Sequence, residues 1–355
     1  MEKLKCKICG FEAFNLEPHI NSDHKDQGGL EWYMDKYDAE IEDIIVSKTK
    51  TTKITRKVKM DTIKFGEEDL EIQKREMDLI PIKNNGYHFS KDLISDLVLD
   101  IKENKKIMLT GHTGSGKSSH IVQLASHIGQ GLIRVNLNGQ TTIGDFVGLW
   151  TVKAGETIWI DGALPKAMRE GYWLLVDEID FGEAAILSVI NAILEPNGSL
   201  MLKEKGDEVI KPHPDFRIFS TANTAGCMQD FRGMYQGTNI MNEAFLDRWR
   251  VYEMKYLPSD IEIKVLEDHD PRITKIIATR VVSVANMIRS AFYNEEITCT
   301  FSTRKLLDWT DNMIRHKEPL KAAQATIFNK IPKEDAEAIK GIITRVMVGS
   351  NKGTE

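Results

Sequence analysis

The sequence lacks several features that would tie it to a membrane or to an oxidising compartment. Its 355 residues contain no run of about eighteen apolar side chains, the length that a membrane-spanning helix needs. The first six residues are too polar for a secretory signal, and four cysteines are too few for a disulfide framework. We therefore expect a cytoplasmic protein with no membrane partner.

The sequence also lacks a strong excess of positive charge. The net charge of -6 argues against a protein that coats nucleic acid over its whole surface. Locally, residues 47–59 carry six basic side chains and no acidic one. We interpret this stretch as a solvated linker or an exposed strand, in preference to a nucleic-acid patch.

The apolar pattern predicts an α/β domain followed by a helical one. From Lys106 onward, short apolar segments alternate with segments of helical periodicity, which is typical of a parallel sheet. Five strands are expected, at 107–110, 132–137, 173–176, 216–221 and 250–254. Helices between them are expected at 117–128 and 183–194. Beyond Pro258 only helices are expected, at 274–292, 302–315 and 333–348.

A glycine-rich motif follows the first expected strand. It reads Gly111-His112-Thr113-Gly114-Ser115-Gly116-Lys117-Ser118, matches GxxxxGK[ST], and is followed by a helix. Its glycines let backbone N–H groups approach phosphate oxygens, the Lys117 ammonium is expected to reach the β- and γ-phosphates, and the Ser118 hydroxyl is expected to bind Mg²⁺. The predicted ATP-binding residues are Gly111, His112, Thr113, Gly114, Ser115, Gly116, Lys117, Ser118, Ser119 and Asp177.

Polar residues end two later strands. Asp177 and Glu178 follow the apolar run that begins at Trp173, at the strand end where ligands bind in open α/β sheets. We expect Asp177 to hold Mg²⁺ through water and Glu178 to act as general base toward the attacking water. Asn223 ends the fourth strand and is expected to contact that water and the γ-phosphate.

Together these motifs resemble the AAA+ ATPases, and within them the MoxR branch, in particular the cobaltochelatase (CobS-like) ATPase subunits. The resemblance covers roughly half of the chain closely. It is carried by Gly116–Ile121, Arg134–Leu137, Lys211–Arg217, Thr221–Thr224, Tyr235–Thr238 and Asp247–Trp249.

The resemblance implies a ring, commonly a hexamer, in which a neighbouring subunit completes each ATP site. Arg248 matches the arginine finger of such rings, with a surface ion pair as the alternative interpretation. Arg304 matches the sensor-2 arginine of the lid, with an ordinary helix start as the alternative. The resemblance also implies a partner with a von Willebrand factor A domain and a client protein.

Two segments resemble hairpin insertions of this branch, at 148–162 and 199–211. The first alternates apolar and polar residues around a turn at Ala154–Glu156, and the second turns at Lys205–Asp207. In the family such hairpins face the ring's pore or the client. Trp150 and Trp159 in the first hairpin fit that role and a packing role equally well.

The amino terminus carries a possible zinc site. Cys6, Cys9, His19 and His24 have the spacing x2, x9 and x4, and two thiolates with two imidazoles form a tetrahedral zinc ligand set. A module this small would depend on the metal for folding. We prefer this structural zinc finger to a chance grouping, and we leave its target, partner protein or DNA, open.

The sequence thus predicts a zinc-finger module at 1–28, a linker at 29–85, an AAA+ core at 86–256 and a helical lid at 257–355. The leading function is a ring-forming ATPase that hydrolyses ATP to remodel a partner protein, with cobaltochelatase-type metal insertion as one form. The alternatives are a nucleic-acid-binding ATPase that uses the zinc finger and basic linker, and a nucleotide-gated scaffold with little turnover.

Overall fold

The computed structural model describes residues 60–65, 68–73, 77–223, 239 and 241–348, and two short amino-terminal strands, β1 (Leu4–Lys5) and β2 (Glu12–Ala13). These two strands pair antiparallel. The chain forms two compact units, Met1–Lys59 and Met60–Glu355. The predicted zinc ligands, Cys6, Cys9, His19 and His24, lie outside the described residues, as do the basic residues of 47–59. The zinc finger therefore stays a prediction.

The second unit contains the predicted five-stranded parallel sheet. Its strand order is β13-β5-β12-β9-β6, and every neighbouring pair is parallel. The strands are β5 (Ile107–Thr110), β6 (Leu132–Asn136), β9 (Trp173–Asp177), β12 (Arg217–Ala222) and β13 (Arg250–Glu253). The sequence prediction of five strands is confirmed, with ends that differ by at most one residue.

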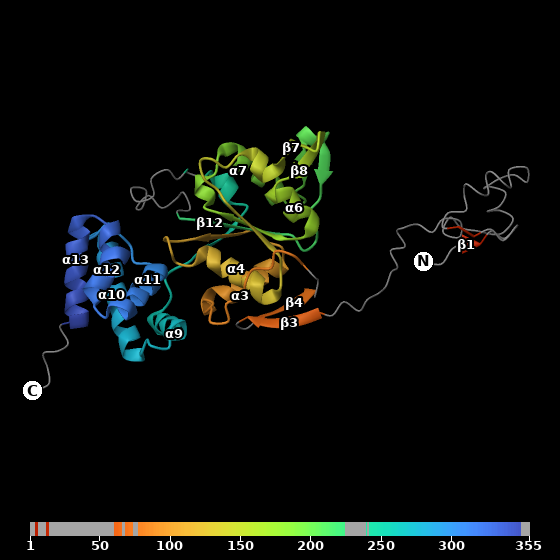
Figure 1. Cartoon of the computed structure of the whole chain (residues 1–355). Helices are drawn as coiled ribbons and strands as arrows, with labels where there is room; N and C mark the ends of the chain where they lie inside the picture. The colour runs from red at the N-terminus through yellow and green to blue at the C-terminus, as the bar shows by residue number, and fades with distance from the viewer. Residues whose placement is uncertain are drawn as a thin grey trace, which may run out of the picture. The chain divides into compact units, whose positions relative to one another are not determined.

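Helices cover both faces of the sheet (Figure 1). Because side chains alternate along a strand, Leu109 and Leu175 face one side, while Met108 and Leu174 face the other. The first side packs against α3 (Lys91–Lys102) and α4 (Lys117–Ile128), and the second against α6 (Ala163–Glu170) and α7 (Ala184–Leu194). Short helical turns complete this part: α5 (Ile143–Val147), η3 (Ile179–Phe181) and α8 (Glu243–Leu246).

In the described residues of this unit, three antiparallel hairpins accompany the sheet. They are β3–β4 (Met60–Phe65 and Glu68–Gln73), β7–β8 (Gly148–Lys153 and Glu156–Asp161) and β10–β11 (Leu200–Leu202 and Glu208–Ile210), the last enclosing η4 (Lys203–Lys205). The second and third confirm the two expected hairpins. The first lies in the stretch predicted as a linker, and its Phe65 is buried in the same core as Leu97 of α3.

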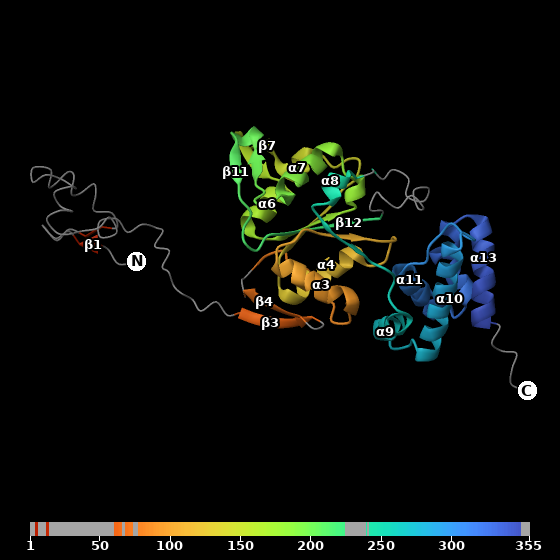
Figure 2. The ribbon, with the colours of Figure 1, turned by 180° about the vertical axis from the view of Figure 1, so that it is seen from behind.

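The carboxy-terminal part is helical, as predicted (Figure 2). It comprises α9 (Ser259–His269), α10 (Lys275–Tyr293), α11 (Thr303–His316), α12 (Pro319–Thr326), η6 (Phe328–Lys330), α13 (Lys333–Ile343) and a π-helical turn η7 (Thr344–Val348). Its separate core includes the fully buried side chain of Trp309. No helix in the described part of the chain is both long enough and apolar enough to span a membrane.

Candidate nucleotide site

The glycine loop joins β5 to α4, and two of its glycines have no room for a side chain. A Cβ on Gly111 would lie 2.3 Å from the carbonyl oxygen of Met254, and one on Gly114 would lie 2.3 Å from the Cβ of Ser302. Both glycines also have positive φ angles, which L side chains rarely adopt. The loop therefore runs close to β13 on one side and to the start of α11 on the other.

The side chain of Lys117 is buried inside this loop. Its Nζ donates to the carbonyl oxygens of Gly111 at 2.6 Å and His112 at 3.2 Å, and to Oδ1 of Asn223 at 3.2 Å. Burial lowers the pKa of Lys117 to about 8, although the nearby carboxylates of Asp180, Asp177 and Glu178 act against the shift. A buried ammonium bound to neutral oxygens is well placed to attract an anion.

Asp177 accepts hydrogen bonds from three other elements. Ser118 Oγ, at the start of α4, donates to its Oδ1 at 2.6 Å, and Thr221 Oγ1 on β12 donates to the same oxygen. Arg134 on β6 donates to Oδ2 from Nε at 2.9 Å and also from Nη2. Burial opposes ionisation of Asp177, but these hydrogen bonds outweigh it and hold its pKa below the ordinary value.

Glu178 follows with a left-handed backbone, at φ 55°. Its N–H donates to Thr221 Oγ1 at 3.1 Å, so the residue is fixed to the neighbouring strand. Burial raises the pKa of Glu178, and the carboxylates of Asp177 and Asp180 raise it further. A carboxylate in this setting is a stronger base than an exposed glutamate.

Asn223 lies between the loop and the acids. Its Oδ1 accepts from Lys117 at 3.2 Å and from Thr113 Oγ1 at 3.4 Å, and its N–H donates to Asp180 Oδ2 at 3.0 Å. The amide is therefore held over the loop by contacts on two sides.

These side chains surround a cavity of about 300 Å³. It is lined by Thr113, Gly114, Gly116, Lys117, Ser118, Ser119, Arg134, Asn136, Asp177, Glu178, Thr221, Asn223 and Arg304. Gly111, His112 and Ser115 instead line an adjacent cavity of about 390 Å³, whose lining shares Asn223 with the first. The structure thus brings most of the predicted site residues together, Arg304 of the lid among them.

Arg248, the predicted arginine finger, lines neither of these two cavities. Its guanidinium donates to Glu195 Oε1 from Nε at 2.8 Å and from Nη2 at 2.6 Å, and to the carbonyl oxygen of Ala244. Within one subunit, Arg248 therefore makes the surface ion pair that was the alternative interpretation. Glu195 lies at the carboxyl end of α7.

The lid and Tyr256, the last residue before it, contact the loop directly. Tyr256 Oη donates to the carbonyl oxygen of Thr113 at 3.3 Å, and the rings of His112 and Phe292 meet edge to face at 5.4 Å. Ser302, which lies against Gly114, caps α11 by accepting the N–H of Lys305 at 3.2 Å. Arg304 thus lies in the first turn of a capped helix and also lines the nucleotide cavity, and its sensor-2 role stays a prediction.

Four polar side chains of the site were not predicted as site residues: Arg134, Asn136, Asp180 and Thr221. The alternation of β6 contains the signal for Arg134. Leu132 packs on the α4 side of the sheet, so Arg134 and Asn136 point the same way. Asp180 is fully buried beside Lys117 and Asn223, which only the folded η3 turn could reveal.

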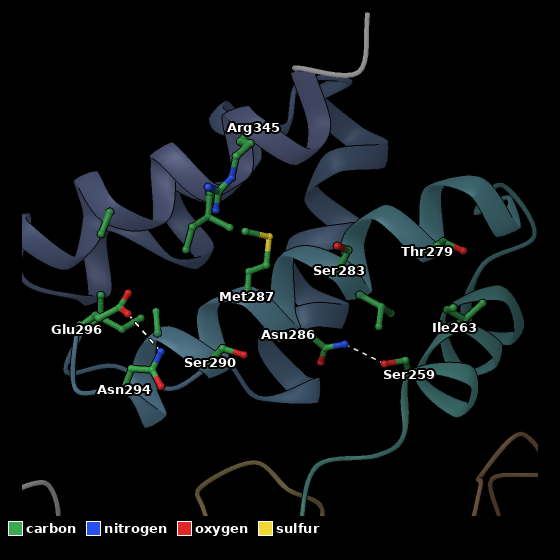
Figure 3. Close-up of a pocket in the computed structure, with 15 residues that line it drawn as sticks. Ser259, Ile263, Thr279, Ser283, Asn286, Met287, Ser290, Asn294, Glu296 and Arg345 are labelled. Atoms are coloured by element: carbon green, nitrogen blue, oxygen red, sulfur yellow. Dashed lines mark hydrogen bonds between the residues drawn. The ribbon is translucent and has the colours of Figure 1, made fainter. Parts of the chain in front are cut away.

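A larger cavity, of about 620 Å³, lies in the lid between α9, α10 and α13 (Figure 3). Its wall contains hydrogen bonds from Asn286 to Ser259 at 2.8 Å and from Asn294 to Glu296 at 3.2 Å. Glu296 and Arg345 are the charged residues of its lining. It has neither a glycine loop nor a paired carboxylate and hydroxyl, so it is not the phosphate site.

The residues that line the cavity of about 300 Å³ fit ATP and Mg²⁺. Lys117 and the N-terminus of α4 supply positive charge for phosphate, and the Ser118 hydroxyl with the Asp177 carboxylate supplies the oxygen ligands that Mg²⁺ prefers. The fold and this site define a P-loop ATPase.

Comparison with known proteins shows to which family of P-loop ATPases the chain belongs. The family described as AAA domain (dynein-related subfamily) matches residues 106–248, and the CbbQ/NirQ/NorQ C-terminal family matches residues 262–347. Aerobic cobaltochelatase subunit CobS of Sinorhizobium sp. is 32% identical over 260 residues, which is 71% of this chain and 78% of CobS. The chain therefore belongs to the MoxR-type AAA ATPases, the family of CobS, and is an ATP-hydrolysing enzyme.

Other relatives differ widely in length. An uncharacterized protein of Staphylococcus haemolyticus is 29% identical over 269 residues, which is 74% of this chain and 98% of that protein. Midasin of Dictyostelium discoideum is 30% identical over 180 residues, which is 50% of this chain but 3% of midasin. The shared region is thus an ATPase module that occurs in proteins of very different size.

Proposed function

We propose that this enzyme assembles as a ring and uses ATP hydrolysis to remodel a partner protein. The observation that supports remodelling is a group of exposed apolar side chains on the two hairpins β7–β8 and β10–β11. Side chains exposed by 42% to 71% are Leu149, Trp150, Val152, Ile160, Met201 and Val209. Neighbouring exposed apolar side chains of this kind mark a surface for another protein.

The two hairpins form one surface. Trp150 Nε1 donates to the carbonyl oxygen of Glu204 at 2.8 Å, and Arg169 donates to Asp161 on β8 and to Glu208 on β11. Trp159 is partly buried against the core and meets Trp150 edge to face at 5.6 Å. In this proposal Trp159 has the packing role, while half-exposed Trp150 contacts the client.

The chemistry follows from the side chains of the smaller cavity. Lys117 binds the β- and γ-phosphates, while Ser118 and Asp177 hold Mg²⁺, which neutralises phosphate charge when bound. Glu178 takes the proton of the attacking water, and its raised pKa suits that role. Asn223 orients the water against the γ-phosphate. These roles agree with the contacts that surround the cavity.

In the proposed ring, commonly a hexamer in this branch, Arg248 completes the site of the neighbouring subunit. A guanidinium is suited to stabilising the charge that develops on the γ-phosphate. The Arg248 side chain is 31% exposed and is bound to an exposed carboxylate. Such a pair contributes little, so its exchange for a phosphate partner costs little. Arg304 contacts the γ-phosphate of the ATP that is bound in its own subunit.

The partner in this proposal carries a von Willebrand factor A domain, and the client accepts a remodelling force from the hairpins. A metal-inserting chelatase subunit is one candidate client, because the relative CobS is named as a subunit of an aerobic cobaltochelatase. The zinc module at 1–28 would dock one of these proteins.

The Glu178→Gln variant tests the proposal. It should bind ATP with unchanged affinity, lose at least about 100-fold in hydrolysis rate, form ATP-dependent rings in sedimentation, and retain partner and client in a pull-down. Glu183→Gln, the same change at an exposed position near the start of α7, is the matched control and should hydrolyse ATP normally. An unchanged hydrolysis rate in Glu178→Gln would exclude the catalytic assignment. Trapped particles that remain monomeric would exclude the ring.

A further inference from the structure

Arg134 is the one arginine of the α/β core that lines the phosphate cavity, among the residues that the structure describes. It lies on β6, the edge strand of the sheet, opposite Leu175 in the register of β6 and β9. Its side chain is 52% exposed, whereas the carboxylate that it contacts, Asp177, is 5% exposed. A long, half-exposed cation thus reaches over a buried anion at the centre of the site.

Its contact uses the last accepting positions of Asp177. An ionised carboxylate has about four lone-pair positions. Ser118 and Thr221 occupy those of Oδ1, and the Nε and Nη2 groups of Arg134 occupy those of Oδ2. A magnesium ion, or a water molecule bound to it, can therefore reach Asp177 only if one of these donors leaves.

Arg134 is the donor that can leave at least cost. Thr221 is buried within β12, and Ser118 is fixed in the first turn of α4. Arg134 has a long side chain with half of its surface in solvent, so water can solvate the guanidinium when it leaves the carboxylate. The double charge of Mg²⁺ also repels a guanidinium that shares its carboxylate.

A displaced guanidinium has a partner close by. Arg134 lines the same cavity as Lys117 and the loop residues that face the phosphates. The planar fork of a guanidinium matches two oxygens of a phosphate as well as it matches two oxygens of a carboxylate. The triphosphate enters this cavity together with the metal, so the new partner comes with the displacing ion.

We propose that Arg134 is a nucleotide-binding residue that exchanges partners: it gives up Asp177 when Mg²⁺ binds there and takes a phosphate oxygen of ATP. The exchange couples the arrival of the metal to recognition of the phosphates, so that neither ligand alone satisfies all the charges of the site. This inference rests on the role of Asp177 proposed above, and its test separates the two.

The test uses the full chain and measures binding rather than turnover. Mn²⁺ binding without nucleotide is followed by electron paramagnetic resonance, and Mg·ATP binding by competition with a fluorescent ATP analogue. In Arg134→Gln, Mn²⁺ should bind about 3- to 10-fold more tightly, because the competing cation is gone. Mg·ATP should bind about 5- to 30-fold more weakly, because the phosphate contact is lost. A higher affinity for Mn²⁺ together with a lower affinity for Mg·ATP in the same variant is the result that the exchange predicts.

A fixed ion pair would give a different result. If Arg134 stayed on Asp177 with the nucleotide bound, its removal would tighten both ligands or leave Mg·ATP unchanged, and either result overturns the proposal. Arg134→Lys keeps the charge but not the fork, and it should recover part of the Mg·ATP affinity. It also serves as the readout if Arg134→Gln fails to fold: Mg·ATP affinity equal to that of the natural protein would then exclude a forked phosphate contact.

Two further variants complete the experiment. Arg272→Gln removes another arginine that makes a forked contact with an aspartate, Asp270, and should change neither affinity. Asp177→Asn should abolish the Mn²⁺ signal. If the signal survives in Asp177→Asn, the magnesium role proposed for Asp177 is wrong. If the Mn²⁺ signal is lost in Asp177→Asn, but the two affinities do not change in opposite directions in Arg134→Gln, only the proposed exchange is wrong.

Discussion

In the nucleotide site, charged groups are buried: Lys117 is 8% exposed, and the side chain of Asp177 is 5% exposed. On the two hairpins, apolar side chains are exposed: Val152 is 71% exposed and Trp150 is 49% exposed. Each region departs from the usual distribution of side chains, in opposite directions. In the proposed function, the ligand repays the desolvation of the buried charges, and the client protein covers the exposed apolar side chains.

Buried charges also occur outside the nucleotide site, and removing one of them should give the largest effect on stability. In the lid, Arg289 donates to both oxygens of Glu262 at 2.8 Å, and Thr303 Oγ1 donates to the same carboxylate at 2.8 Å. Glu262→Ala would leave the guanidinium buried without its anion and should lower the free energy of unfolding by about 3–5 kcal/mol. Chemical denaturation measures this change.

The matched control is Glu337→Ala, which removes an exposed partner of Lys340 on α13 and should cost under about 0.5 kcal/mol. If Glu262→Ala costs no more than Glu337→Ala, burial of a charge in this fold does not predict its energetic weight. The comparison between buried and exposed regions would then lose its basis.

Lys117→Met should give the next largest effect, and on binding rather than stability. The change removes charge-assisted hydrogen bonds to the phosphates, so the affinity for ATP should fall at least about 100-fold. The folded chain should not become less stable, because the buried ammonium is itself costly. Isothermal titration and thermal unfolding measure the two quantities. A lower midpoint of unfolding would show that Lys117 is a structural residue.

The pH dependence of the free energy of unfolding also tests whether the buried Lys117 ammonium is costly. The pKa of Lys117 is about 8 in the folded chain, against an ordinary value of 10.5 for a solvated lysine, so between these values the unfolded chain binds more protons. The Lys117 contribution to stability should therefore rise with pH across this window, by roughly 3 kcal/mol at most. The measurement is the difference in free energy of unfolding between the natural protein and Lys117→Met at pH 7 and pH 10. A difference that is independent of pH would contradict the lowered pKa.

The sequence predicted those parts of the molecule that depend on local pattern. The apolar strands gave the five-stranded sheet, and the glycine loop with Asp177, Glu178 and Asn223 gave most of the cavity lining. Helices α3, α6, α9 and α12 were not predicted. Two of them, α6 and α12, contain a proline in the first turn, Pro165 and Pro319, a position that a helix tolerates.

What the sequence could not supply depends on register and on long-range contacts. Arg134 contacts Asp177 only because β6 pairs with β9 in one register. In this register Asn136 lies opposite Asp177, and Arg134, two residues earlier on the same face, lies opposite Leu175. The pair between Arg248 and Glu195 joins residues that are 53 positions apart. Alternation along β6 indicates the face on which Arg134 lies, but it does not name the partner, so both contacts required the folded structure.

The smallest expected effect on the isolated protein comes from Val152→Ser. The side chain is 71% exposed on β7, so its replacement should change the free energy of unfolding by less than about 0.5 kcal/mol and leave ATP affinity unaltered. In the Glu178→Gln background, however, the same change should reduce capture of the client several-fold, because apolar contact area is lost there. Ile82→Ser, at a side chain 91% exposed and outside the hairpins, is the matched control and should leave capture unchanged. Equal capture by both variants would mean that exposure alone does not identify the client surface, and the hairpins would have to be explained by contacts between subunits instead.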